Sequence, residues 1–407
     1  MKRILLLVAL TLVSIGGSEH SRAKEGSIER IEPKQECLLP YPQRGRGAGG
    51  EGHGHNVVGM QQAPSAFIAE WTLPAAFSHA QLVSAVRERS GAERSTLWHF
   101  QAASRGGGGF LPGARVLLDA HNCYPEREQW NDRLDRALKT GLPVAIEQDL
   151  AWHTDKTSGR SWSVVVHHLP PSGSEPTLRT YFFEQIRPLV EHALQSGDRK
   201  DWPLVTLNLD FKTEEREHLE FIWRLLEEYE DWLCTAPRTA TPETLAPLGL
   251  RPVLVLTGSS DAQQKVFYDA VRVGGRLRLF GAVNLPNNES TPLDLVPSAN
   301  NYRRWWNNSW AVVEEGGQQN SGDWTTAEAE RLRSLVSTAH AKGLWIRFYT
   351  LNGHMETDSL GWTKSYNFGS LERAQLRWQA AVEAGADFIA TDQYEALAAL
   401  RLRNSVK

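Results

Sequence analysis

Carboxylates and a lysine stand at the ends of two apolar, strand-like runs of this sequence. Glu147 and Asp149 are two residues apart in PVAIEQDL. Asp210 and Lys212 are likewise two apart in LVTLNLDFK. Because side chains alternate between the faces of a strand, the members of each pair point to the same side. Three carboxylates at one place repel one another unless a proton or a cation lies between them, and oxygen ligands suit Mg²⁺ or Ca²⁺. The spacing therefore predicts a divalent-cation site, while the simpler reading is that each acid caps a helix or pairs with an arginine.

Histidines stand at the ends of two further runs. RVLLDAHN ends in His121 and Asn122, and the inserted run SWSVVVHH ends in His167 and His168. In a regular strand His168 faces away from His167, which makes His167 the better partner for His121. Two imidazoles that titrate near neutral pH suit proton transfer to and from a reacting group. The plainer reading of each histidine is a hydrogen-bonded polar residue.

Short apolar runs alternate with segments of helical period from residue 115 onward. The predicted strands are residues 115–122, 143–150, 204–212, 252–259, 277–283, 310–317, 344–352 and 386–393. Near-continuous hydrophobic strands are typical of parallel sheets that are buried on both faces. Right-handed crossovers close such strands into a barrel whose active site lies at their carboxyl ends. The fold prediction is therefore α/β, a (β/α)₈ TIM barrel. A doubly wound open sheet is the alternative, although no G-x-G-x-x-G follows the first run.

The sixth predicted strand adds acids to the same end of the barrel. Residues 310–317, WAVVEEGG, place Glu314 and Glu315 after its apolar part. We expect these acids to contact substrate or the metal, or at least one of them to pair with a cation.

The first residues have the pattern of a secretory signal. Lys2 and Arg3 precede the apolar run 4–15, which is too short to span a bilayer, and small residues follow. We predict a signal peptide over residues 1–23 and a secreted or periplasmic mature protein. An uncleaved anchor is the alternative.

A glycine-rich N-terminal extension over residues 24–110 is predicted before the barrel domain, 111–407. It contains QRGRGAGGEGHGHN and SRGGGGF, which are typical of loops. His53 and His55 in this region suit a metal, but a surface loop is the simpler reading.

Composition excludes some functions. The net charge of −4 supplies no basic field of the kind that nucleic-acid binding requires, so no nucleic-acid partner is expected.

Fifteen tryptophans should be mostly packing residues, with some at a rim that meets lipid or sugar. Cys37, Cys123 and Cys234 allow one disulfide in an exported chain, but their wide spacing gives no zinc motif. A nucleophilic Cys123 lacks any surrounding cysteine-hydrolase signature.

The order of these motifs resembles the phospholipase-C-like phosphodiesterase superfamily. This superfamily includes glycerophosphodiester phosphodiesterases, bacterial phosphatidylinositol-specific phospholipases C and spider-venom sphingomyelinases D. DAHN is similar to the family's A-H-R-G or A-H-M, and AIEQDLAWHTDKTSGRSWSVVVHH to its E-x-D strand, T-x-D turn and V-V-x-H-D strand. LNLDFK is similar to its acid-x-lysine, YTLN to W-T-V-N, and GADFIATDQ to the closing G-x-D-x-I-x-T-D. The resemblance runs from residue 115 to about residue 400.

The resemblance implies a role for each site residue. His121 and His167 would be the catalytic acid/base pair. The implied metal ligands are Glu147, Asp149 and Asp210, and the implied substrate contacts are Lys212, Asn122 and Tyr349. These roles suit phosphodiester cleavage, because a cation and a lysine stabilise charge on the non-bridging oxygens. The implied activity is that of a phosphoric diester hydrolase that uses Mg²⁺ or Ca²⁺.

The sequence departs from the family at three of these positions. Asn122 stands where many glycerophosphodiesterases have arginine, and their E-N-T segment is not visible after it. Tyr349 replaces the usual tryptophan, and His168 replaces an aspartate. Phosphate contact should therefore depend more heavily on Lys212 and the metal. The intact E-x-D acids argue against the metal-free phospholipase C branch.

Three kinds of function remain open from the sequence. The first is an exported hydrolase of glycerophosphodiesters or phospholipid headgroups, with peripheral membrane contact and with water or a substrate hydroxyl as nucleophile. The second is a secreted glycosidase that pairs Glu147 with Glu314 or Glu315, which needs no histidines or lysine and keeps activity in EDTA. The third is a barrel that binds a ligand without catalysis.

Overall fold

The computed structural model describes residues 110–126, 131–166, 169–288, 290–315, 317–355, 357 and 366–404. Several predicted features lie outside the described residues: the signal peptide, almost all of the extension, Cys37, His53, His55, His167 and His168. These features stay predictions.

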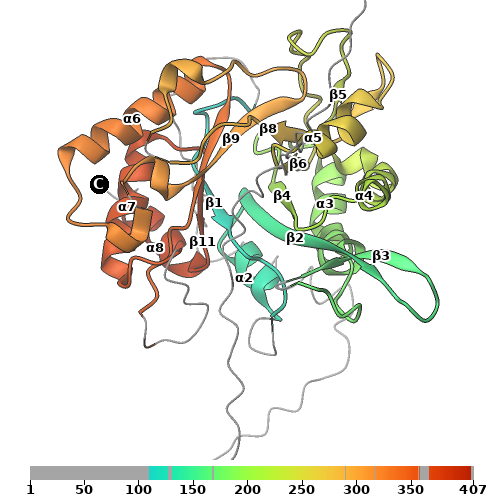
Figure 1. Cartoon of the computed structure of the whole chain (residues 1–407), viewed down its shortest axis with the longest axis horizontal. Coiled ribbons are helices and arrows are strands. Elements are labelled where there is room, and N and C mark those ends of the chain that lie inside the picture. The colour runs from blue at the N-terminus through green and yellow to red at the C-terminus, as the bar shows by residue number, and fades with distance from the viewer. Residues whose placement is uncertain are drawn as a thin grey trace, which may run out of the picture. The chain divides into compact units, whose positions relative to one another are not determined.

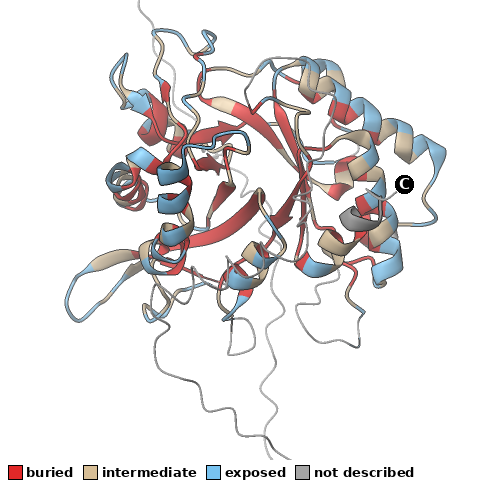
Figure 2. Ribbon diagram, turned by 180° about the vertical axis from the view of Figure 1, so that it is seen from behind, coloured by how far each residue is buried: buried red, intermediate tan, exposed pale blue. Residues whose placement is uncertain are grey.

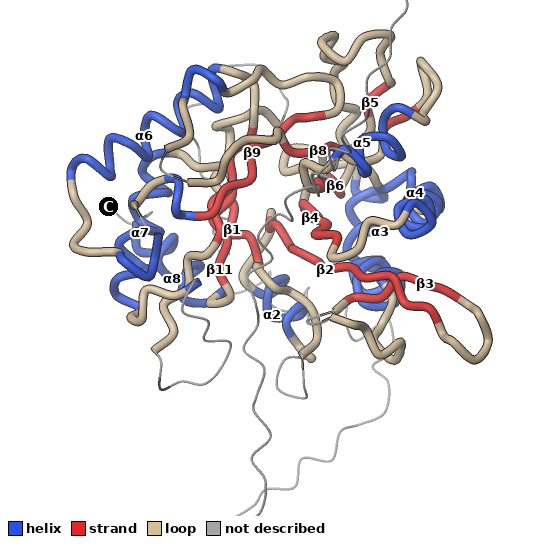
Figure 3. The backbone as a smooth tube through the Cα atoms, viewed as in Figure 1, coloured by secondary structure: helices blue, strands red, loops and turns tan. Residues whose placement is uncertain are grey.

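Eight parallel strands close into a barrel. They are β1 (Leu117–Ala120), β2 (Val144–Thr154), β4 (Val205–Phe211), β6 (Val253–Thr257), β8 (Phe280–Ala282), β9 (Arg303–Ser309), β10 (Trp345–Tyr349) and β11 (Phe388–Thr391). Each strand lies beside its neighbours in this order, and β1 pairs with both β2 and β11, which closes the ring. Figure 1 and Figure 3 show the strands as the inner ring. The TIM-barrel prediction is confirmed, and a doubly wound open sheet is excluded.

Helices lie outside the strand ring. The longer ones are α2 (Arg133–Lys139), α3 (Glu184–Ser196), α4 (Arg216–Glu228), α6 (Thr326–Ala341), α7 (Leu371–Ala384) and α8 (Tyr394–Asn404). Shorter helical turns are η2 (Arg179–Phe183), η3 (Glu230–Trp232), α5 (Asp261–Gln264), η4 (Lys265–Asp269), η5 (Leu293–Leu295), η6 (Trp310–Val312) and η7 (Gly317–Asn320). Figure 2 shows strands buried along most of their length and helices with one buried and one exposed face. That pattern is typical of amphipathic helices packed on a barrel.

Helix α4 illustrates how the sequence produces this packing. It buries His218, Leu219, Ile222, Leu225 and Leu226. These residues recur three or four positions apart, so they form one stripe along the helix. The charged residues between them remain on the solvent side, and the helix is held on the barrel by its apolar face.

The sixth strand lies earlier in the chain than predicted. It is β9, Arg303–Ser309, while Trp310–Val312 of the predicted strand forms the turn η6. The sequence RRWWNNS hides the strand because arginines and asparagines interrupt its apolar pattern. Trp305 and Trp306 are nevertheless both buried, and Asn308 is buried between strands. The prediction of a strand over 310–317 was therefore wrong.

A long hairpin extends the barrel at β2. The outer half of β2 pairs in antiparallel fashion with β3 (Ser161–Val165), with Leu150 opposite Val165. The backbone N–H of Val166 then donates to the carbonyl of Asp149 at 3.0 Å. The predicted inserted strand is thus present. A separate small sheet pairs β5 (Ala236–Pro237) with β7 (Arg276–Leu277).

Tryptophans fill much of the core, as the composition suggested. Trp202, Trp305, Trp306, Trp310 and Trp378 are among the largest fully buried side chains. The indole N–H of Trp305 donates to the carbonyl of Thr257 at 2.9 Å, which satisfies its one polar atom. Among the described residues, none of the helices combines the length and the apolar character needed to cross a membrane.

Candidate active site at the carboxyl ends of the strands

A cavity of about 230 Å³ opens at the carboxyl ends of the barrel strands. Its walls include His121 after β1, Glu147 on β2, Asp210 on β4, and Arg347 and Tyr349 on β10. Strands β4 and β10 are the second neighbours of β1 on either side of the ring. The cavity therefore receives side chains from both sides of His121.

Strand register brings the three predicted metal ligands together. Asp149 on β2 and Asp210 on β4 are direct partners across the parallel pair, and Glu147 lies two residues before Asp149. One oxygen from each acid lies within 4.8 Å of the others. Glu147 and Asp149 are 4% and 3% exposed. The structure thus assembles a compact set of oxygen donors from adjacent strands.

Lys212 occupies the space between two of these acids. Its Nζ lies 2.9 Å from Asp149 Oδ2 and 2.6 Å from Asp210 Oδ2. Burial lowers the pKa of Lys212, but the charges of Asp149 and Asp210 outweigh burial and raise this pKa above its ordinary value. The second oxygen of Asp149, Oδ1, is buried and has no hydrogen-bond partner among the described residues. The lysine therefore pairs with only some of the carboxylate oxygens in the cluster.

Arg347 lies among acids on the opposite side of the cavity. Its Nε donates to Asp119 Oδ2 at 2.5 Å, its Nη2 donates to Glu147 Oε2, and its Nη1 donates to Asn307 Oδ1 at 3.0 Å. Arg347 and Asp119 are 2% and 1% exposed. The charges of Asp119 and Glu147 outweigh burial and raise the pKa of Arg347. It is a permanent internal cation that links β10 to β1, β2 and β9.

The cluster contains more acids than bases. Its carboxylates are Asp119, Glu147, Asp149 and Asp210, and its permanent cations are Lys212 and Arg347. Four acids minus two bases leave two surplus negative charges when every acid is ionised. Burial, aided by the charges of Asp210 and Glu147, raises the pKa of Asp149 to about 8. Burial also raises the pKa of Asp119. Burial therefore opposes the ionised form of both acids.

Asp392 orients His121. The Nδ1 atom of His121 lies 2.7 Å from Asp392 Oδ1, and the two side chains are 5% and 8% exposed. Because a carboxylate only accepts, Nδ1 is the donor and Nε2 is directed to Glu147, whose Oε2 lies 3.9 Å away. The Tyr394 hydroxyl donates to the backbone carbonyl of His121 at 2.8 Å. Nε2 is thus the nitrogen that can exchange a proton with a ligand in the cavity.

Neighbouring charges raise the pKa of His121. Burial lowers the pKa of the imidazole, but the charges of Glu147 and Asp392 outweigh burial and raise the pKa of His121 above its ordinary value. An imidazole with a raised pKa carries a proton for a larger fraction of the time at neutral pH. The geometry can therefore present a proton donor beside the acid cluster.

The predicted substrate contacts Asn122 and Tyr349 both line the cavity, but their polar groups have partners. The amide nitrogen of Asn122 donates to both oxygens of Asp392 at 3.0 and 3.2 Å, and its amide oxygen accepts from the Tyr124 hydroxyl at 2.8 Å. The Tyr349 hydroxyl accepts from Asn287 at 2.9 Å. Asn122 adopts a left-handed conformation, φ 52°. Its side chain supports the His121–Asp392 pair.

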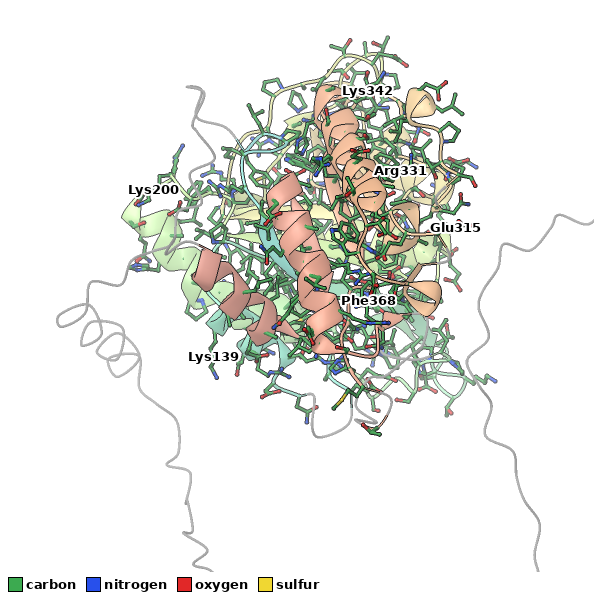
Figure 4. The ribbon with its side chains drawn as sticks, turned by 90° about the vertical axis from the view of Figure 1, so that its left-hand side faces the viewer. Lys139, Lys200, Glu315, Arg331, Lys342 and Phe368 are labelled. Atoms are coloured by element: carbon green, nitrogen blue, oxygen red, sulfur yellow. The ribbon has the colours of Figure 1, made fainter. Side chains whose placement is uncertain are left out.

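Glu314 and Glu315 do not line the cavity. Glu314 is buried in an ion pair, with its Oε1 2.6 Å from Arg377 Nη2 and its Oε2 3.0 Å from Arg377 Nε. Glu315 is exposed and lies at the outer edge of the molecule in Figure 4. The prediction that the sixth strand brings acids to the mouth was wrong, because that strand ends at Ser309. The expectation that one of the two acids pairs with a cation is confirmed.

The described cysteines are not nucleophiles. Cys123 and Cys234 are buried and free. Burial raises the pKa of each thiol to about 12. A thiol of that pKa is not ionised near neutral pH, and the thiolate is the reactive form. A nucleophilic role for Cys123 therefore has no support from its surroundings.

Sequence reasoning missed Arg347 and gave Asp392 no role. Arg347 is an arginine inside the apolar run LWIRFYTLN, which is itself a signal, because a charged residue in a barrel strand must be paired. Asp392 was visible in the motif GADFIATDQ at the end of the last strand. Its partner could be named only after β11 was known to lie beside β1.

Comparisons with known proteins add weak fold similarities. No protein-family model matches the chain, and no curated protein matches its sequence. A glycerophosphoryl diester phosphodiesterase from Parabacteroides distasonis is 12% identical, with a TM-score of 0.36 over 71% of this chain and 87% of that one. A Plasmodium falciparum HPPK-DHPS is 7% identical, with a TM-score of 0.38 over 74% of this chain and 48% of that one. A Bacteroides ovatus GH5 xyloglucanase is 12% identical, with a TM-score of 0.22 over 73% of this chain and 66% of that one.

Proposed function

We propose that this chain is an exported, divalent-cation-dependent phosphoric diester hydrolase that acts on glycerophosphodiesters or phospholipid headgroups. One observation carries the proposal: His121, held by Asp392, lies beside Glu147 in a cavity that Glu147 and Asp210 line, and Asp149 lies close to both of these acids. The order of motifs along the sequence supports the same reading. An imidazole beside a set of oxygen donors suits cleavage of an anionic ester.

The acid cluster fits a hard divalent cation. All three donors, Glu147, Asp149 and Asp210, offer carboxylate oxygens, which suit Mg²⁺ or Ca²⁺. Asp149 Oδ1 is buried without a partner among the described residues. One dication also equals the cluster's two surplus negative charges. When bound, such a cation would neutralise charge on the non-bridging phosphate oxygens.

The side chains of this chain would divide the remaining work. His121 Nε2 would transfer a proton between the cavity and the substrate, and Asp392 would keep its Nδ1 protonated. Lys212, at the edge of the cluster, would contact a phosphate oxygen. His167 is proposed as the second acid/base group from the sequence. The nucleophile is water or a neighbouring substrate hydroxyl, and the latter gives a cyclic phosphate.

The alternatives have less support. A glycosidase needs two carboxylates that face one sugar, roughly 5–10 Å apart. Glu314 is instead buried against Arg377, so the pair with Glu147 that the sequence offered is not assembled. A barrel that only binds ligand would not require the tuned His121–Asp392 pair. Export, with peripheral contact to a lipid surface, rests on the N-terminal pattern and the substrate class.

A panel assay tests the proposal. Purified protein would be incubated with glycerophosphodiesters, phosphatidylinositol and sphingomyelin, in Mg²⁺, in Ca²⁺ and in EDTA. We expect cleavage of at least one of these substrates in metal and none in EDTA. His121→Ala should reduce kcat about 10³-fold. The matched control is His192→Ala, which removes an exposed histidine of α3 and should leave kcat unchanged.

Three outcomes contradict the proposal. Cleavage of xyloglucan or another polysaccharide that persists in EDTA would favour the glycosidase. Equal rates for His121→Ala and wild type would remove the imidazole from the mechanism. Binding of a phosphodiester without turnover, in the presence of either metal, would leave a ligand-binding barrel.

A further inference from the structure

The cavity lacks the phosphate contact that the family resemblance would lead one to expect after His121. Asn122 stands where many glycerophosphodiesterases have arginine. Its amide is already bonded to Asp392 and to Tyr124. A neutral amide with its donor and acceptor both occupied offers little to a phosphate oxygen. Position 122 therefore supplies no guanidinium to the cavity.

Another arginine reaches the same cavity from a different strand. Arg347 on β10 lines the cavity with His121 and Lys212. It contacts Asp119, Glu147 and Asn307, one acceptor for each of its three nitrogens. A guanidinium carries more N–H donors than these three acceptors use, since both terminal nitrogens bear a second hydrogen. Donors therefore remain on a rigid cation at the cavity wall.

We propose that Arg347 contacts the substrate phosphate and takes the place of the arginine absent at Asn122. This inference rests on the proposed function, because it assumes that the cavity receives a phosphodiester. Lys212 approaches from β4 and Arg347 from β10, on the two sides of His121. The phosphate would lie between these two cations, and a bound dication would balance the two surplus negative charges that the four acids leave.

The contacts of Arg347 make it suited to this role. Asp119 and Glu147 fix the guanidinium plane from two strands, so little side-chain freedom is lost when a ligand binds. The planar fork can donate two parallel hydrogen bonds to a phosphate, which the ammonium of lysine cannot do. Arg347→Lys should therefore keep the charge and lose affinity for phosphate.

Phosphate binding tests the inference without relying on turnover. Affinity of the full chain for inorganic phosphate would be measured by titration calorimetry in Mg²⁺. We expect Arg347→Lys to weaken binding about 10-fold. In the substrate assay the same variant should raise KM more than it lowers kcat. The matched control is Arg377→Lys, a buried arginine that pairs with Glu314 outside the cavity, and it should bind phosphate as wild type does.

A second variant tests the inference if Arg347→Lys does not fold. Arg347→Gln with Asp119→Asn removes the guanidinium and one buried acid together, so the net charge of the cluster does not change. It would be compared with Asp119→Asn alone, which keeps the arginine. Phosphate affinity should fall about 10-fold between these two proteins.

The outcomes separate this inference from the proposed function. Equal phosphate affinity in wild type and Arg347→Lys, with normal cleavage by both, overturns the inference and leaves the hydrolase standing. Phosphate binding that depends on Arg347, without cleavage of any substrate in the panel, supports the inference and overturns the hydrolase. A wild-type protein that binds no phosphate in Mg²⁺ overturns the inference outright.

Discussion

Two buried arginines of this barrel pair with acids in different ways. Arg377 meets Glu314, whose two oxygens accept from the guanidinium and, at Oε2, from the Trp310 indole at 2.5 Å. Arg347 meets Asp119 and Glu147 beside a cavity, and Asp119 Oδ1 is buried without a partner among the described residues. Both arginines are almost fully buried. Burial alone does not distinguish them.

The difference lies in charge balance and access. One base against one acid, with every acid oxygen bonded, gives a closed pair that fixes α7 against the turn after β9. The cluster around Arg347 has surplus acids, incompletely bonded oxygens and a cavity wall. A pair in which every oxygen is bonded is costly to break, whereas a cluster with unbonded oxygens can still accept a cation. Surplus charge at a cavity is therefore the better sign of a functional site.

Removal of the divalent cation from the cluster around Arg347 should produce the largest effect. In EDTA, kcat/KM should fall about 10³-fold or more, because metal stabilisation of phosphate charge is worth several kcal/mol. Asp149→Asn should lose a similar factor and bind Mg²⁺ more weakly by calorimetry. The matched control is Asp198→Asn, an exposed acid after α3, which should behave as wild type. Full activity of Asp149→Asn in EDTA would show that the surplus charge has no catalytic role.

Breaking the closed pair should affect stability alone. Arg377→Met leaves Glu314 buried and uncompensated, which should lower the free energy of unfolding by about 3–5 kcal/mol. Urea unfolding monitored by tryptophan fluorescence measures this change. Activity per folded molecule should remain at the wild-type level. If that activity falls, Arg377 is coupled to the site and the contrast with Arg347 is wrong.

The barrel itself was readable from the sequence. Seven of its eight strands coincide with predicted runs, because strands buried on both faces, such as β6 with VLVLT, read as continuous apolar segments. Strand β9 was not predicted because arginines and asparagines interrupt its apolar pattern. Asn308 is buried while Arg304 packs its guanidinium 4.6 Å from the centre of the Phe280 ring. Polar residues that find partners inside a barrel cannot be distinguished from surface residues by pattern alone.

The site was only partly readable for a similar reason. Glu147, Asp149 and Asp210 could be grouped because period-two spacing and parallel pairing follow from local sequence. Asp392 reaches His121 across 271 residues of chain, through the pairing of β1 with β11. Such a contact depends on ring closure, which spacing along the chain does not encode.

Two buried histidines extend the comparison from arginines to titration. His218 is fully buried on α4, with Nε2 2.8 Å from Ser163 Oγ and Nδ1 2.9 Å from the carbonyl of Thr213. Burial lowers its pKa from 6.5 to about 4, and the hydrogen bond to the Thr213 carbonyl and the charge of Glu215 offset this only in part. His121, in contrast, has Asp392 and Glu147 as neighbours, and its pKa is raised. Protonation of His218 should therefore change the free energy of unfolding, and protonation of His121 should change the rate of catalysis.

The stability effect of His218 has a defined direction. The unfolded chain takes up a proton below pH 6.5 and the folded chain does not until about pH 4, so this contribution is present above 6.5 and is lost as pH falls. Two and a half pKa units correspond to about 3 kcal/mol. The free energy of unfolding, measured in urea between pH 7.5 and 4.5, should therefore decline more steeply with falling pH for wild type than for His218→Gln. Parallel declines would show that His218 titrates normally in the folded chain.

The smallest effect should come from Asp392→Asn, which keeps His121 and the acid cluster in place. The imidazole loses one charge-assisted hydrogen bond at Nδ1, and kcat should fall about 10-fold, since such a bond is worth roughly 1.5 kcal/mol or more. Because the Asp392 charge raises the pKa of His121, its removal lowers that pKa, and the limb of the pH–rate profile that His121 controls moves to lower pH. The control His192→Ala, at an exposed histidine of α3, should leave that limb within a few tenths of a unit. A limb that stays in place for Asp392→Asn would mean that the titrating group of the cavity is not His121, and the histidine would then belong with His218 as a structural residue.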